Sequence, residues 1–153
     1  SLDLIGRVVQ RCANVVGLKD SSGQLGLMAA CQTLRGGDFN VTSGSDANVL
    51  ASTAMGFDGC VSGNSNVVPE LLVSLQSAAS AGELPRARAL QRSLDAVRAV
   101  LQDGSDLSLF KAVLARRGIP VGLVRAPMIP ASEARVEQAW RGLHRTAVRS
   151  ASL

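Results

Sequence analysis

The sequence contains no tyrosine, one tryptophan, one histidine and three phenylalanines among its 153 residues. Proteins that bind nucleic acid commonly combine clustered basic side chains with aromatic rings on which bases stack. Here the net charge of +4 comes from arginines that are spread over several segments without interleaved aromatics. The composition therefore argues against a nucleic-acid partner.

Cysteines and long apolar runs are also scarce. Cys12, Cys31 and Cys60 are odd in number and far apart, and no C-x-x-C or Cys/His spacing is present. The sequence thus indicates neither a disulfide framework nor a zinc site, and we expect no metal or other cofactor and a reducing compartment. No apolar run reaches the ~18 residues of a membrane span, and the first residues lack a signal-peptide pattern. We therefore expect a cytoplasmic chain without a membrane partner.

Lysine occurs only twice, as Lys19 and Lys111, against 14 arginines. An amine can lose its proton to become a nucleophile, whereas a guanidinium in a protein does not. Lys19 lies in the stretch NVVGLKDSSGQ (residues 14–24), between an apolar run and a cluster of small polar residues. The position is consistent with a catalytic amine, and equally with a solvated charge at the end of a strand.

Apolar spacing predicts alternating helices and short strands in the first half of the chain. With 46% hydrophobic residues, the chain has enough apolar side chains for one sizeable core. In chain order we expect a helix ending near residue 12, a strand at 15–18, a helix from a Ser22 cap to residue 36, a strand at 39–43, a short helix from an Asp46 cap to residue 56, a strand at 59–62 and a helix at 69–81. This alternation predicts an α/β fold with parallel strands, because a helix makes each crossover.

The second half is expected to be helical, at residues 84–101, 107–117 and 132–148. Trp140 belongs to an apolar stripe of the last helix, so we interpret it as a packing residue. Lys111, in the middle of a helix, and His144 are interpreted as structural and surface residues. A parallel sheet of only three strands has two open edges, which indicates that the chain is part of a larger fold.

Parallel strands bring their carboxyl ends to one side of the sheet, where barrel enzymes carry their active sites. Here that side would hold Lys19, the turn at residues 44–46 and the turn at residues 62–64. In an apolar barrel, desolvation disfavours the ammonium form of a lysine, and the neutral amine can attack a carbonyl carbon. The protonated imine that results stabilises a carbanion while a neighbouring C–C bond breaks or forms.

Residues 16–23, VGLKDSSG, resemble the Schiff-base lysine motif of the dihydrodipicolinate synthase and N-acetylneuraminate lyase superfamily, which are class I pyruvate-type aldolases. Residues 41–46, VTSGSD, resemble the seventh strand and glycine turn of that family, and GCVS at 59–62 with Asn66 resembles its eighth strand. FKA at 110–112, GIP at 118–120 and RAP at 125–127 resemble its C-terminal helical region. The resemblance covers about residues 1 to 145.

The resemblance implies the C-terminal part of a (β/α)8 TIM barrel, with the end of helix 5 and strands 6 to 8 at residues 1–82 and a helical tail at 83–153. It implies that Lys19 forms the imine and that Gly44 and the Val61 carbonyl line the pocket around the keto acid. Ser21 and Asp46 match positions that contact the polar tail of the substrate. As structural alternatives, Ser21 and Asp46 are helix caps and Gly44 supplies a positive φ angle.

The sequence departs from the family in lacking five earlier βα units, with the glycine-threonine loop that holds the substrate carboxylate and the tyrosine that moves protons. We therefore expect the missing N-terminal half of the barrel to be a partner of this chain. The full-length form is expected to be a homo-oligomer, either a dimer or a tetramer. The fragment alone is expected to be inactive. An alternative of another class is a non-catalytic half-barrel that serves as an interaction module. An upstream reading frame with a tyrosine-bearing first half would favour the enzyme.

The resemblance implies a lyase that acts on pyruvate-type 2-oxo acids, and two turn residues bear on the substrate. Ala47 replaces an acidic residue typical of sialate lyases, and Ser45 replaces an acid found in many dihydrodipicolinate synthases. The glycine-serine turn favours an aldolase that cleaves a 4-hydroxy-2-oxo acid or a 2-keto-3-deoxy sugar acid into pyruvate and an aldehyde. The alternative is a 4-hydroxy-tetrahydrodipicolinate synthase or a related dehydratase.

Overall fold

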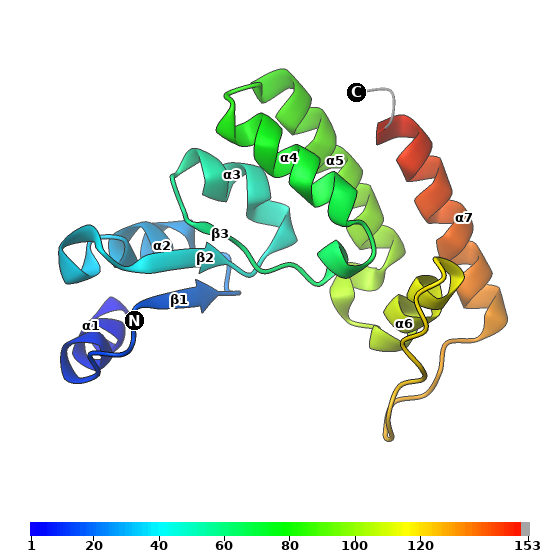
Figure 1. Ribbon diagram of the computed structural model, residues 1–153, viewed down its shortest axis with the longest axis horizontal. Helices are drawn as coiled ribbons and strands as arrows, with labels where there is room; N and C mark the ends of the chain where they lie inside the picture. Colours follow the sequence, from blue (N-terminus) through cyan, green and yellow to red (C-terminus); the bar gives the residue numbers. More distant parts are fainter. Residues whose placement is uncertain (151–153) are drawn as a thin grey trace.

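The computed structural model of the chain describes residues 1–150, apart from the side chains of residues 103 and 147–150. Three strands alternate with helices in the first half, and helices make up the second half (Figure 1). The strands are β1 (Gly17–Asp20), β2 (Asn40–Ser43) and β3 (Gly59–Cys60). The α-helices are α1 (Leu2–Arg11), α2 (Leu25–Cys31), α3 (Val49–Ala54), α4 (Pro69–Ser80), α5 (Leu84–Val100), α6 (Leu107–Arg116) and α7 (Glu133–Ser150). Short 3-10 turns are η1 (Leu34–Gly37), η2 (Asp46–Asn48), η3 (Asn64–Asn66) and η4 (Gln102–Gly104).

The three strands form one parallel sheet in the order β1-β2-β3, which confirms the predicted topology. Figure 1 shows the arrows of β1 and β2 pointing the same way. Lys19 is paired with Thr42, and Thr42 in turn with Gly59. These three residues make one row across the sheet, so their side-chain positions lie on the same face.

Two element boundaries differ from those predicted in the first βα unit. β1 begins at Gly17 and includes Lys19, because pairing with β2 fixes the extended segment two residues beyond the apolar run. Helix α2 ends at Cys31, and the η1 turn occupies the remaining residues of the predicted helix. Ser22 does not cap α2, since Gln24 precedes the helix and the Ser22 hydroxyl instead donates to Asp20 at 2.7 Å.

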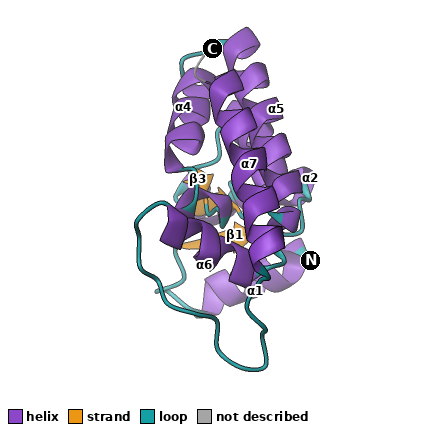
Figure 2. Cartoon of the chain, turned by 90° about the vertical axis from the view of Figure 1, so that its right-hand side faces the viewer, coloured by secondary structure: helices purple, strands orange, loops and turns teal. Residues whose placement is uncertain are grey.

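The other helices agree with the predicted ranges to within two residues, and two core clusters hold them together. A small cluster between α1, α2 and the sheet contains Val9, Met28 and Val41. A larger cluster joins α4 to α7 and includes Leu75, Leu94 and the partly buried Trp140, which confirms Trp140 as a packing residue. Figure 2 shows α4 and α5 above the strands, with α7 in front. The larger cluster crosses residue 82, so the two halves of the chain share one core.

Lys111 has a structural role in this second half, as predicted. Its Nζ donates to the backbone carbonyls of Val121 and Leu123, both at 2.9 Å. These bonds fasten the segment between α6 and α7, which otherwise exposes apolar side chains such as Ile129. His144 is exposed, and its Nδ1 lies 2.9 Å from the Trp140 carbonyl.

The two faces of the sheet have different environments. Leu18 and Val41 face α1 and α2, and Val41 is fully buried. Lys19 and Thr42 alternate with them and therefore lie on the opposite face, which we call the inner face. Lys19 is exposed there and Thr42 is half-buried. The inner face is thus the open side of the sheet in this chain.

No helix in the described part of the chain is both long and apolar enough to cross a membrane.

We expect the 153-residue chain to self-associate. The outer edge of β1 has no paired strand among the described residues, and nearby apolar side chains are exposed, namely Leu4 at 55% and Val16 at 56%. Open strand edges and contiguous apolar surface promote association between chains. Sedimentation velocity should show oligomers, and Val16→Lys should reduce them because a charge disfavours edge pairing.

The matched control is Val73→Lys, which introduces the same charge at a 65% exposed position on α4. It should leave the oligomers unchanged. A monodisperse monomer that melts cooperatively would contradict this prediction and would favour the interaction-module alternative.

Candidate active site

The candidate site lies where β1 and β2 end, and it is built around a close approach between three residues. Gly44 follows β2, and its N–H donates to the Asp20 carbonyl of β1 at 2.6 Å. A Cβ added at Gly44 would overlap the Lys19 Cε and the Ser21 Oγ. The two side chains therefore lie directly against the Gly44 backbone, and only glycine leaves room for them.

This contact decides between two explanations for glycine at position 44. The φ angle of Gly44 lies outside the left-handed region, so the predicted alternative of a positive φ is wrong. Space is the reason for the glycine. The Lys19 and Ser21 side chains occupy the space that a Cβ at position 44 would need.

Ser21 does not act as a helix cap. Its side chain is exposed, and helix α2 begins four residues later at Leu25. Asp20, the neighbour of Lys19, accepts the N–H and the hydroxyl of Ser22, each at 2.7 Å. This turn at the end of β1 fixes the backbone on either side of Ser21, and the Ser21 hydroxyl faces Gly44.

Val61 extends the third strand by one residue beyond its assigned end. Its N–H donates to the Ser43 carbonyl at 2.8 Å, which continues the parallel pairing of β2 and β3. No described residue donates a hydrogen bond to the Val61 carbonyl, and the side chain is 51% exposed. The carbonyl oxygen is therefore free to accept a hydrogen bond from a ligand, in the row of residues that also contains Gly44.

Asp46 is not brought together with Lys19. Its side chain is buried, and its carboxylate accepts the Asn64 amide at 2.5 Å and the Cys60 thiol at 3.7 Å. Ser45, and not Asp46, occupies the cap position of η2, so the predicted capping role of Asp46 is wrong. Its contact with the polar tail of a substrate stays a prediction.

Burial raises the pKa of the Cys60 thiol to about 11. The negative charge of Asp46 and the hydrogen bond to it act in the same direction, and the positive charge of Lys19 opposes them. The thiol is therefore protonated at neutral pH and serves as a donor to Asp46. A protonated thiol is a weak nucleophile, so we assign Cys60 no nucleophilic role.

No role was assigned to Thr42 from the sequence, and Asn64 was included only as part of the turn at residues 62–64. Thr42 lies between Lys19 and Gly59 on the inner face, and its hydroxyl donates to the Leu18 carbonyl at 3.3 Å. The alternation of the second strand places Thr42 on the same face as Lys19 once the register is known. The contact of Asn64 with Asp46 joins two loops and has no local signal in the sequence.

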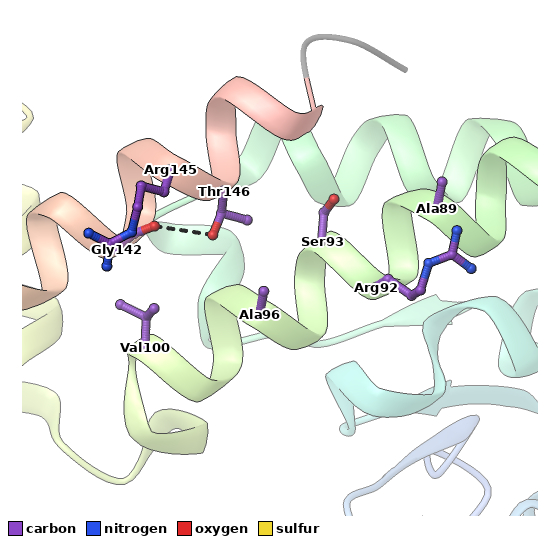
Figure 3. A pocket seen from close by; sticks show the side chains of 8 residues that line it. All are labelled: Ala89, Arg92, Ser93, Ala96, Val100, Gly142, Arg145 and Thr146. Atoms are coloured by element: carbon purple, nitrogen blue, oxygen red, sulfur yellow. Dashed lines mark hydrogen bonds between the residues drawn. The ribbon is translucent and has the colours of Figure 1, made fainter.

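Among the side chains that the structure describes, no three His, Cys, Asp or Glu residues are grouped to hold a metal ion. A groove lies between α5 and α7, away from Lys19 (Figure 3). Its floor carries Ala89, Ser93 and Ala96 of α5, with Arg92 and Arg145 beside them. None of its lining residues comes from a strand, so we assign the groove no part in the chemistry at Lys19.

Comparisons with known proteins identify the family of the chain. A model of the dihydrodipicolinate synthetase family matches residues 1–145. The chain belongs to this family. It is 32% identical over 136 residues to 4-hydroxy-tetrahydrodipicolinate synthase of Brucella abortus, covering 89% of this chain and 46% of that protein.

Solved structures give the same result for the fold. The 4-hydroxy-tetrahydrodipicolinate synthase from Methylacidiphilum fumariolicum superposes with a TM-score of 0.84 at 27% identity, over 99% of this chain and 51% of that one. KD(P)GA from T. tenax superposes with a TM-score of 0.81 at 26% identity, over 94% and 51%. The chain spans about half the length of these family members, which are TIM barrels, and the α/β fold class is confirmed.

We expect Gly44→Ala to destabilise the protein by about 0.5–1.5 kcal/mol, because the new methyl group forces the exposed Lys19 and Ser21 side chains out of their rotamers. Urea unfolding measures the loss. The control is Gly26→Ala in α2, where no atom lies within 4 Å of the added Cβ and alanine favours the helix. Equal stability of Gly44→Ala and the unmodified chain would contradict the close approach.

We expect Cys60 to resist alkylation in the folded chain. At pH 8 a pKa near 11, in place of 9.0, lowers the thiolate fraction by about 100-fold. Unfolding restores the ordinary value, so the contribution of this thiol to stability is complete below pH 9 and is lost as the pH rises to about 11. Mass mapping after iodoacetamide treatment should show slow labelling of Cys60 that becomes fast in urea. Equal rates in the two states would contradict the burial of this thiol beside Asp46.

Proposed function

We propose that this chain is the C-terminal half of a lysine Schiff-base lyase that acts on pyruvate-type 2-oxo acids. The observation that carries the proposal is the contact of Lys19 with the Gly44 backbone on the open inner face, at the carboxyl ends of parallel strands. Amines at this end of a barrel sheet are placed to react with a carbonyl substrate. Membership of the family supports the reaction class.

We place β1, β2 and β3 as strands 6, 7 and 8 of the barrel, within residues 1–82, and residues 83–153 as its C-terminal helical region. The half-length match to the relatives supports only that the chain is part of a longer barrel. The first half of the barrel would cover the inner face and shield Lys19 from water. It would also supply the tyrosine and the carboxylate-binding loop that this chain lacks.

The neutral amine of Lys19 attacks C2 of the 2-oxo acid, and the carbinolamine loses water to give a protonated imine. In a 4-hydroxy-2-oxo acid, the 4-hydroxyl then loses its proton as the C3–C4 bond breaks, and the electron pair of that bond moves toward the iminium nitrogen. An aldehyde leaves, and the enamine takes a proton at C3. Hydrolysis of the new imine releases pyruvate and regenerates the lysine.

In this proposal the described residues hold the keto acid at one end. Gly44 provides a flat backbone surface beneath the adduct, and the Val61 carbonyl accepts a hydrogen bond from it. The Ser21 hydroxyl, which faces Gly44, contacts the polar part of the substrate. Asp46 reaches that part only if its bond with Asn64 opens.

The substrate we favour is a 4-hydroxy-2-oxo acid or a 2-keto-3-deoxy sugar acid. The glycine-serine turn has no acidic side chain at position 45, because that residue is serine. Ser45 is half-buried, and its N–H donates to the Ser43 hydroxyl at 3.2 Å. The likeness to KD(P)GA from T. tenax is consistent with an aldolase. The second candidate is 4-hydroxy-tetrahydrodipicolinate synthase, which the relative from Brucella abortus favours by name.

The experiment uses the longer protein that contains this chain. Pyruvate with borohydride should trap a stable secondary amine on Lys19, detected by peptide mapping, because reduction fixes the imine carbon to Nζ. Lys19→Arg keeps the charge and removes the nucleophile. It should abolish both trapping and aldol cleavage, by at least about 1000-fold, while the fold persists.

The matched control is Lys111→Arg, which keeps a cation that can donate to the Val121 and Leu123 carbonyls. It should trap pyruvate and turn over as the unmodified protein does. An adduct on Lys111, no adduct on either lysine, or turnover by Lys19→Arg would refute the Schiff-base assignment and leave the interaction module as the better account.

A further inference from the structure

A glutamine from the C-terminal helical region reaches the loop that follows Gly44. Gln91 lies on α5, and its Nε2 donates to the Asp46 carbonyl at 2.9 Å. Its Oε1 accepts the Leu50 N–H at 3.1 Å. One side chain therefore bridges both ends of the segment that contains η2, across 45 and 41 residues of sequence.

The neighbours of Gln91 fix the orientation of its amide. Nε2 also donates to Asp95 Oδ1 at 3.2 Å, so it faces two acceptors, and Oε1 faces a backbone donor. A flipped amide would set oxygen against two acceptors and NH2 against an N–H group. Only the neutral amide in this orientation satisfies all three contacts.

The loop from Gly44 to Leu50 is consequently held from several sides. Gly44 donates to the Asp20 carbonyl, and the Asp46 carboxylate is held by Asn64 and Cys60. Gln91 hydrogen-bonds the backbone of the same loop to α5, and the buried Val49 side chain belongs to the core that includes α5. Because Gly44 lies against Lys19, a shift of this loop moves the surface on which a keto acid would react.

We propose that Gln91 is a positioning residue, whose side-chain amide holds the loop after Gly44 in the shape that lets a keto acid react with Lys19. This inference rests on the proposed Schiff-base function. Gln91 would not touch the substrate and acts through the Asp46 and Leu50 backbone.

The chain offers a matched control on the neighbouring helix. Gln76 of α4 is also half-buried, and its Oε1 accepts the Thr53 hydroxyl at 3.0 Å. Gln76→Glu keeps this acceptor and adds one negative charge. Gln91→Glu adds the same charge and keeps the acceptor for Leu50, but it sets a carboxylate against the Asp46 carbonyl and the Asp95 carboxylate.

The test measures the rate and the final amount of borohydride-trapped pyruvate on Lys19 in the longer protein. Gln91→Glu should lower the trapping rate constant per reactive site by about tenfold or more, because small displacements at a reacting centre have large effects on rate. Gln91→Met, which introduces a flexible uncharged side chain, should also lower the trapping rate constant. It should speed hydrogen exchange of the Leu50 amide, because the acceptor of the Leu50 N–H is lost. Gln76→Glu should behave as the unmodified protein.

A purely structural role would reduce the final amount of adduct and leave the rate constant per site unchanged. That result overturns the inference. If Gln91→Glu does not fold, Gln91→Met decides, and trapping by Gln91→Met at the rate of the unmodified protein also overturns the inference. If the unmodified protein forms no adduct on Lys19, the proposed function fails separately. Hydrogen exchange of the Leu50 amide then still tests whether Gln91 holds the loop. An unchanged exchange rate in Gln91→Met overturns that part of the inference.

Discussion

The close approach of the Gly44 backbone to the Lys19 and Ser21 side chains is the constraint on which the account of this chain depends. The approach follows from the parallel register, since the Gly44 N–H bonds to the Asp20 carbonyl one residue after Lys19. Alternation along β1 then turns Lys19 away from the core that covers Leu18. The amine of Lys19, an exposed face and the Gly44 backbone are thereby set in one place.

The C-terminal helices do more in this arrangement than add apolar burial. The core that α4 and α5 share with α6 and α7 fixes α5 in place, and α5 presents Gln91 to the loop after β2. On the strand side, the Cys60 thiol and the Asn64 amide hold the Asp46 carboxylate. The loop beside Lys19 is therefore supported from both halves of the chain.

The sequence was sufficient to predict the features that depend on local periodicity. The α4 and α5 helices, the parallel order of the strands and the packing role of Trp140 follow from apolar spacing. The beginning of β1 could not be predicted, because pairing with β2 sets it. The contacts of Gln91 and Asn64 with Asp46 could not be predicted, because these residues lie 45 and 18 positions from Asp46, beyond any local pattern. The reason for Gly44 also needed coordinates, since spacing does not distinguish a positive φ from a lack of space.

The most direct test of the account is a crystal structure of the longer protein after reduction with pyruvate and borohydride. The account predicts continuous density from Lys19 Nζ to C2 of the former pyruvate. The adduct should lie over the Gly44 backbone, within hydrogen-bond reach of the Val61 carbonyl. An unmodified Lys19, with pyruvate bound elsewhere or absent, would contradict the claim that this lysine is the catalytic amine.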